Sequence, residues 1–161
     1  MRVRLQREVD VEASARAVWD YVTDWPRHQE WVPLTRVERV DAAAGVGGRF
    51  RAWTGLGPFG FWDPMTITAW ERSGDGGGRW EVLHLGPVVK GEAEFVVLAR
   101  GPQASRFVWA EVIDVPLGGV GAAGWRVARP VAERLLDRAL HRMRRLVEEQ
   151  TKMSTRASEP S

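Results

Sequence analysis

The stretch RWEVLHLGPVVKGEAEFVVLARGPQASRFVWAEVIDV (residues 79–115) contains three β-strand patterns joined by two short turns. In the segments 79–85, 90–100 and 105–115, apolar residues alternate with charged or polar ones, as in strands with one buried face. The turns are Gly86-Pro87 and Gly101-Pro102. Strands at this spacing with such short connections predict an antiparallel meander.

The sequence before this meander predicts four more strands and two short helices. Val3, Leu5, Val9 and Val11 share one parity, which indicates a half-buried first strand. Ser14 has the chemistry of an N-cap for a helix at 15–23. The remaining elements are expected as a helical piece at 26–31, strands at 34–40, 49–53 and 64–72, turns at 42–48 and 73–78, and a loop at 54–62.

The last element is predicted as an amphipathic helix over residues 131–147, because apolar residues recur there every three or four positions. Its apolar stripe consists of Val131, Leu135, Leu136, Ala139, Leu140, Met143, Leu146 and Val147. Its other face is basic, with Arg134, Arg138, His141, Arg142, Arg144 and Arg145. The glycine-containing segment 118–127 is a candidate extension upstream, and residues 151–161 are expected to form a flexible tail.

This order of elements predicts one α+β domain over residues 1–150. A curved antiparallel sheet of seven strands would wrap around the long C-terminal helix, with two short helices after the first strand. The sheet cannot leave its apolar face in water, so the helix must cover it. A single helix does not fill the concavity of so strongly curled a sheet, and we therefore expect an internal apolar cavity.

Composition excludes several classes of function. The chain of 161 residues has no cysteine, which excludes disulfides, thiolate metal sites and thiol nucleophiles. A net charge of only +2 gives little support to a nucleic-acid partner. The N-terminal residues lack a signal-peptide core and no apolar run is long enough to span a membrane, so a cytoplasmic protein is expected. Nine tryptophans are unusual for this length and suit a cavity with flat apolar walls.

Three stretches carry a resemblance to a known superfamily. They are VEASARAVWDYVTD (11–24) with Trp31 shortly after, FWDPMTITAW (61–70) and VKGEAEF (89–95). With the order of elements, they resemble the START and Bet v 1-like (SRPBCC) superfamily, and most of all its polyketide cyclase/dehydrase and lipid-transport group. The resemblance implies a helix-grip fold with a ligand cavity between sheet and helix. The superfamily has no shared catalytic motif, so the resemblance assigns no catalytic residue.

Strand parity places three ionisable residues on the inward face of the sheet: Arg7, His84 and Glu111. A charge in an apolar cavity is costly unless it is paired. In a helix-grip topology the first and last strands are neighbours, so we expect a cross-strand ion pair between Arg7 and Glu111. This pair would either fasten the sheet, which is the favoured interpretation, or orient a ligand's polar group.

His84 is the only histidine of the meander, and two interpretations of it remain open. An imidazole in the cavity can hydrogen-bond a ligand carbonyl or act as a general base. The alternative is an ordinary core histidine. His84 and Glu111 are therefore candidate catalytic residues, and none is assigned. Asp63, which shares a face with Met65, is expected to cap the turn before its strand.

The leading hypothesis is a protein that binds or carries a small hydrophobic molecule, lipid-like or aromatic and polyketide-like. Apolar burial would give affinity, and Arg7, His84 and Glu111 would give specificity. The predicted ligand-binding residues are Arg7, Phe50, Met65, Ile67, Val82, His84, Phe95, Val97, Trp109, Glu111, Leu135, Ala139 and Met143.

The expected loop at 54–62 is a candidate gate, because its glycines permit hinge motion and its side chains form an apolar lip. The lip residues are Leu56, Phe59, Phe61 and Trp62. Two alternatives are ordinary core packing and a tip that touches a membrane to collect lipid. Gly45 to Gly48 lacks the lysine and the helix of a phosphate-binding loop, so a tight hairpin is expected there and no cofactor. No metal site is expected, since His28, His84 and His141 lie on different elements.

Two other functions compete with a binding role. The first is a cyclase, aromatase or dehydratase that acts on a polyketide-like substrate in the same cavity. The second is an interaction module with a filled core, whose basic helix face docks a partner. Such faces are usually only solvated, but this one has the charge for transient contact with an anionic membrane or an acyl carrier protein.

Overall fold

The computed structural model describes residues 1–41, 45–116 and 118–157. The N-terminal half comprises β1 (Arg2–Val11), α1 (Ala15–Val22), the 3-10 helix η1 (Trp25–Arg27), α2 (His28–Trp31), β2 (Thr35–Arg39) and β3 (Arg49–Leu56). The rest comprises β4 (Phe59–Arg72), β5 (Gly78–His84), β6 (Gly91–Gly101), β7 (Ala104–Asp114) and α3 (Gly118–Ala157). Strand, two short helices, six strands and a long helix are the order that the sequence predicted. The expected turn at 42–48 falls partly outside the described residues, since 42–44 are not among them.

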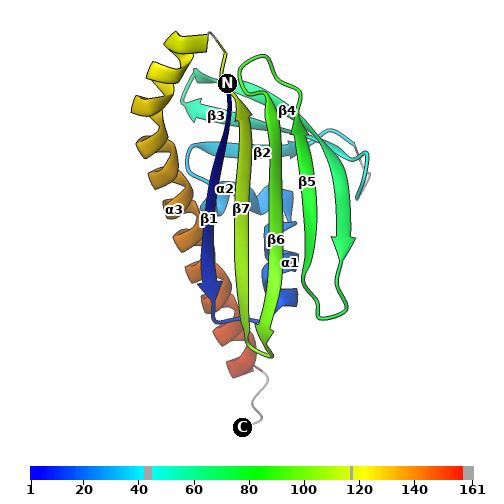
Figure 1. The fold of residues 1–161 in the computed structure, drawn as a ribbon. Coiled ribbons are helices and arrows are strands. Elements are labelled where there is room, and N and C mark those ends of the chain that lie inside the picture. The colour runs from blue at the N-terminus through cyan, green and yellow to red at the C-terminus, as the bar shows by residue number, and fades with distance from the viewer. Residues whose placement is uncertain (42–44, 117, 158–161) are drawn as a thin grey trace.

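The seven strands form one antiparallel sheet in the order β1-β7-β6-β5-β4-β3-β2. Each strand from β2 to β6 pairs with the next along the chain, and β7 pairs with β1. The sheet bends so strongly that β2 and β3 cross behind β6 and β7, and α3 runs along its open side beside β1 (Figure 1). The predicted curved sheet with a long C-terminal helix is confirmed.

The expected loop at 54–62 is wrong, because both flanking strands continue through it. Leu56 pairs with Phe59 at the end of the β3–β4 ladder, which leaves only Gly57 and Pro58 as the turn. Gly57 has φ +56°, which glycine adopts without the steric cost that other residues bear at the first position of a two-residue hairpin turn. The stretch lacks an obvious period in the sequence because several large apolar residues lie on both faces of the hairpin.

Helix α3 is longer than the sequence predicted. It includes the candidate extension at 118–127 and continues through residues 151–157, where a flexible tail was expected; residues 158–161 lie outside the described part. Pro130 lies inside the helix, where its ring removes one backbone donor. The predicted stripe is buried at Leu136, Ala139, Leu140, Met143 and Val147. Val131 departs from it, since 55% of this residue is exposed.

The core beneath α1 is filled by aromatic rings. Trp80, fully buried on β5, stacks on Phe95 with ring centroids 4.6 Å apart and meets Trp19 of α1 edge-on at 5.3 Å. Such pairs add to the free energy gained from burying their area. Trp25 stacks on Phe50 at 4.7 Å and forms the border of this filled region. The hollow part of the concavity therefore lies beyond Trp25, under η1 and α2.

Candidate functional site

Two adjoining chambers occupy the hollow part of the sheet. The inner chamber, of about 160 Å³, lies between the sheet and the η1–α2 segment. The outer chamber, of about 260 Å³, extends from it toward α3. Seven residues line both chambers: Val32, Thr35, Thr54, Asp63, His84, Trp109 and Glu111. The shared residues make the two chambers one candidate site.

Most of the predicted ligand-binding residues lie in these walls. The inner chamber is lined by Phe50, Met65, Val82, His84, Phe95, Trp109 and Glu111, and the outer one by Leu135 and Ala139. Ile67, Val97 and Met143 are buried but line neither chamber. Trp25 and Trp31 also line the inner chamber but were not predicted from the sequence. They come from the η1–α2 segment, and the parity of the strands does not show which way that segment faces.

The polar centre of the cavity is a cluster of Asp63, His84 and Glu111, whose side chains are 7%, 9% and 13% exposed. His84 Nδ1 donates to Asp63 Oδ2 at 2.6 Å. Its other nitrogen, Nε2, lies 3.3 Å from Glu111 Oε2, without the alignment of a hydrogen bond. Trp109 Nε1 donates to Glu111 Oε1 at 2.7 Å and so fixes this carboxylate. His84 Nε2 and Asp63 Oδ1 are left buried without a hydrogen-bond partner.

The cluster holds His84 in its charged form. Burial by itself favours the neutral imidazole and lowers the pKa of His84. The hydrogen bond to Asp63 and the interactions with Glu111 outweigh burial, so that the pKa is raised to about 9. At neutral pH the ring is therefore an imidazolium, which donates protons. The general-base role considered from the sequence requires the neutral form of this ring.

Strand register brings these three residues together. His84 is opposite Met65 on β4 and opposite Gly91 on β6, while Glu111 of β7 is opposite Ala93. Gly91 has φ +141°, and a Cβ there would lie 1.9 Å from the Val112 carbonyl oxygen. Only glycine therefore lets β7 approach this end of β6, which keeps Glu111 beside His84.

The predicted ion pair between Arg7 and Glu111 is wrong. In the register of β1 and β7, Arg7 is opposite Trp109, and Leu5 takes the place opposite Glu111. Arg7 instead extends to α3, with its NH2 2.9 Å from Glu133 Oε2 and its Nε 3.1 Å from Asp137 Oδ1. Parity gave the face of the sheet correctly but could not show that two helix carboxylates compete for the guanidinium. Arg7 lines neither chamber.

Asp63 is the functional candidate that the sequence interpretation undervalued. It is buried on β4 and bonded to His84, so it is not the turn cap that was expected. The signal was present, since its parity matches Met65 on the inward face. A buried carboxylate on the inward face of a strand needs a partner, and the inward-facing His84 on the next strand supplies it.

The four predicted gate residues divide between the tip and the two faces of the β3–β4 hairpin. Leu56 and Phe59 at the tip are exposed by 68% and 83%. Phe61 lines the outer chamber, and Trp62 contacts Trp53 and lies under the Arg51 guanidinium, 4.2 Å from its ring centroid. Of the basic residues of α3 predicted as a docking face, Arg134, Arg138, His141, Arg142 and Arg145 are exposed, whereas Arg144 is half-buried and donates to Glu148 at 2.9 Å.

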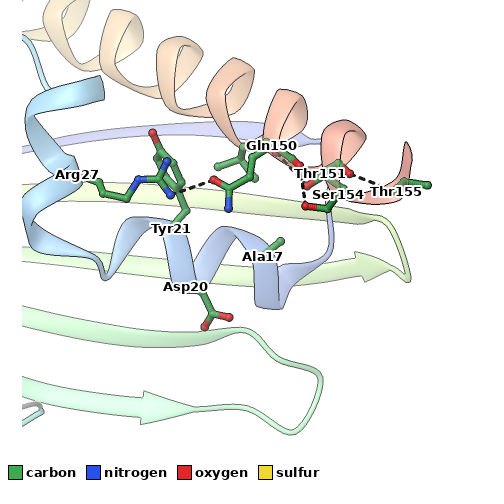
Figure 2. A pocket seen from close by; sticks show the side chains of 9 residues that line it. Ala17, Asp20, Tyr21, Arg27, Gln150, Thr151, Ser154 and Thr155 are labelled. Carbon is green, nitrogen blue, oxygen red and sulfur yellow. Dashed lines mark hydrogen bonds between the residues drawn. The ribbon is translucent and has the colours of Figure 1, made fainter. Parts of the chain in front are cut away.

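A further groove of about 520 Å³ lies between α1 and the C-terminal part of α3 (Figure 2). Its polar side chains already have partners: Arg27 donates to Gln150 at 3.0 Å and to Glu30, which also accepts from Tyr21. Thr151 and Thr155 donate to carbonyl oxygens of their own helix. The groove therefore lacks the buried, unsatisfied polar atoms that distinguish the chambers under the sheet.

Among the residues that the structure describes, no group of His, Asp and Glu could hold a metal ion. The three members of the buried cluster bind one another in a row instead of converging on one point. Within the same described ranges, no helix is long and apolar enough to cross a membrane.

The sheet, the helix and the cavity place the chain in the START/Bet v 1-like class of proteins. A family model described as polyketide cyclase/dehydrase and lipid transport matches residues 2–148. The chain therefore belongs to the polyketide cyclase/dehydrase and lipid transport family. No significant match was found among curated proteins.

Solved structures share this fold at low sequence identity. The Zhui aromatase/cyclase from Streptomyces sp. R1128 is 15% identical with a TM-score of 0.75, over 94% of this chain and 96% of that one. A protein from Thermus thermophilus is 14% identical with a TM-score of 0.74, over 98% and 100%. Norcoclaurine synthase from Thalictrum flavum, in complex with dopamine and hydroxybenzaldehyde, is 15% identical with a TM-score of 0.66, over 92% and 88%. At these identities the likeness extends to the fold alone.

Proposed function

We propose that this protein binds a small ring-containing hydrophobic molecule in the two chambers and holds it by the Asp63–His84–Glu111 cluster. The observation that carries the proposal is a buried polar cluster with an unsatisfied donor inside an aromatic-walled cavity. Small-molecule sites combine mostly apolar walls with a few placed polar groups in this way. The interaction-module hypothesis predicted a filled core, and the two chambers count against it.

The shape of the inner chamber supports a flat ligand. Trp25, Phe50, Phe95 and Trp109 line it, and these side chains offer planar apolar surface. An apolar cavity of about 150 Å³ accommodates one benzene-sized ring. The inner chamber has room for such a ring, and the outer chamber has room for a second ring or a chain.

Two buried N–H groups support a ligand that has an oxygen acceptor. Trp31 Nε1 lacks a hydrogen-bond partner, and His84 Nε2 has only the poorly aligned Glu111 carboxylate 3.3 Å away; both residues line the inner chamber. A buried donor without an acceptor is costly, so a ligand carbonyl or hydroxyl oxygen that met one of them would gain free energy. This requirement adds specificity to the affinity that comes from apolar burial at roughly 25 cal/mol per Å².

The proposal is tested by purifying the protein from its own host and analysing it by native mass spectrometry, followed by organic extraction. We expect a retained small molecule that contains at least one ring and releases when the protein unfolds. The matched control is the Ala52→Phe variant, whose added phenyl group would occupy the inner chamber. Equal recovery of the molecule from both proteins would show that it binds elsewhere.

A second candidate function, proton transfer to and from a bound ketone, is favoured by the charge state of the cluster. An imidazolium at His84 can donate its Nε2 proton to a carbonyl oxygen, while the Glu111 carboxylate removes a proton from the adjacent carbon to give the enol. Cyclase and dehydratase reactions of polyketide-like chains need such an enol. Here His84 is the acid and Glu111 the base.

This activity predicts that the protein accelerates exchange of the α-protons of an aryl ketone, naphthylacetone, with deuterated water. In the His84→Gln variant the rate should fall at least about a hundredfold, as expected for loss of a general acid. NMR integration of the α-protons measures the rate, and naphthylacetone affinity is measured in parallel. Exchange at the same rate in wild type and His84→Gln would remove His84 from the mechanism.

A further inference from the structure

The charge of the cavity carries an inference about the ligand that goes beyond the proposed binding role and rests on it. In the described part of the chain, neither chamber is lined by an arginine or lysine. Arg7, the only such residue that the sequence placed here, is held by Glu133 and Asp137 of α3 instead. The ionisable side chains in the walls are therefore Asp63, Glu111, His84 and His28.

These four groups leave the cavity with a net negative charge. Asp63 and Glu111 contribute two carboxylates, and the one imidazolium, His84, lies between them. His28 adds no charge, because burial lowers its pKa to about 4, and its Nε2 lies 2.6 Å from the Val22 carbonyl oxygen. The sum is one negative charge on side chains that are at most 13% exposed, where charge interactions are screened less than at the protein surface.

The inner chamber also has aromatic rings in its walls, and ring faces attract positive charge. Trp25, Trp31 and Trp109 line the inner chamber together with Phe50 and Phe95. The face of such a ring carries negative electrostatic potential and attracts an ammonium group, most strongly when the group is desolvated. A ligand carboxylate would be repelled, because the only cationic side chain in the walls, His84, is already paired with Asp63 and Glu111.

We propose that the cavity selects its ligand by charge, taking ring compounds with a protonated amine, tolerating neutral ones, and rejecting carboxylates such as fatty acids or aryl acids. Glu111 contributes directly to this selection, since it lines both chambers and its Oε2 makes only an ion-pair contact with His84 Nε2, 3.3 Å away. The ligand's oxygen acceptor for His84 is accordingly a carbonyl or hydroxyl group and not a carboxylate.

The test compares three probes that share one ring system: naphthylethylamine, naphthylethanol and naphthylacetate. Calorimetric titration at neutral pH should give affinities in the order amine, alcohol, carboxylate, with the amine at least about tenfold tighter than the carboxylate. In the Glu111→Gln variant, whose amide oxygen still accepts from Trp109, this ratio should fall toward one. The alcohol should bind both proteins similarly, which shows that the cavity is intact.

The control is Glu92→Gln, which removes the same charge from an exposed position on β6, where Glu92 pairs with Arg2 of β1. It should keep the wild-type preference, because the selection arises inside the cavity and not from the overall charge. If the alcohol binds and the carboxylate binds as tightly as the amine, the charge inference is overturned and the binding function stands. If none of the three probes binds wild type, the cavity-binding proposal fails and the charge inference fails with it.

Discussion

Raising the pH from about 6 to about 9.5 is expected to lower the free energy of unfolding by about 3 kcal/mol through His84 alone. In the folded protein Asp63 and Glu111 raise the pKa of His84 to about 9, against an ordinary value of 6.5. Between pH 6.5 and pH 9 the folded state therefore keeps a proton on His84 that the unfolded state has released. Because the pKa is raised on folding, the stabilisation is fully present below pH 6.5 and is lost as the pH rises through 9.

Urea unfolding followed by tryptophan fluorescence at each pH measures this loss. The His84→Gln variant should start less stable at the acid end of the range and lose little more as the pH rises, since its residue 84 does not titrate. The matched control is His141→Gln, which changes an exposed histidine of α3 and should follow wild type. An alkaline loss of the same size in His84→Gln would contradict the role assigned to the cluster.

His28 should act in the opposite direction on the acid side. It is buried, and burial lowers its pKa to about 4. Between pH 6.5 and pH 4 the unfolded state therefore binds a proton at His28 that the folded state does not bind. The stability contributed by its neutral form is lost as the pH falls from 6.5 toward 4. The combined contribution of these two histidines to stability is therefore largest near pH 6.5.

Filling the inner chamber by Ala52→Phe is expected to reduce the affinity for naphthylethanol at least about a hundredfold. Ala52 is buried on β3, lines the inner chamber and is opposite Asp63 in the β3–β4 register. An added phenyl group would occupy the space that a ligand ring needs and cover the cluster. Calorimetric titration measures the affinity, and urea unfolding shows whether the variant is folded.

The new side chain enters a void, so the cost of overpacking should stay at the low end of about 1–3 kcal/mol. Leu98→Phe is the matched control, because Leu98 on β6 is 41% exposed and lines neither chamber. It should bind the probe like wild type. Unchanged affinity in Ala52→Phe, with the variant folded, would show that ligands do not enter the inner chamber.

The fold could be predicted because its signals are local. Alternation along β6 and β7 assigned Ala93, Phe95 and Phe107 to the inward face, and all three are buried. Prediction failed where a single residue changes the local geometry: Gly57 turns the β3–β4 hairpin within two positions, so the apolar stretch around it is strand and not loop. At α3 the glycine-containing segment 118–127 was only a candidate extension, which the helix includes, and the polar residues 151–157 gave no clear period.

The sequence by itself determined the order of elements, the inward face of each strand and the presence of ionisable residues on that face, because a period of two or 3.6 residues needs no knowledge of neighbours. Only the tertiary structure decided which of those residues meet. Strand register brought Asp63 within hydrogen-bond distance of His84 and placed Arg7 beside the carboxylates of α3, and Asp63 and Glu111 then set the charge of the imidazole. Pairing and solvation depend on distances between segments far apart in the chain, which no local pattern contains.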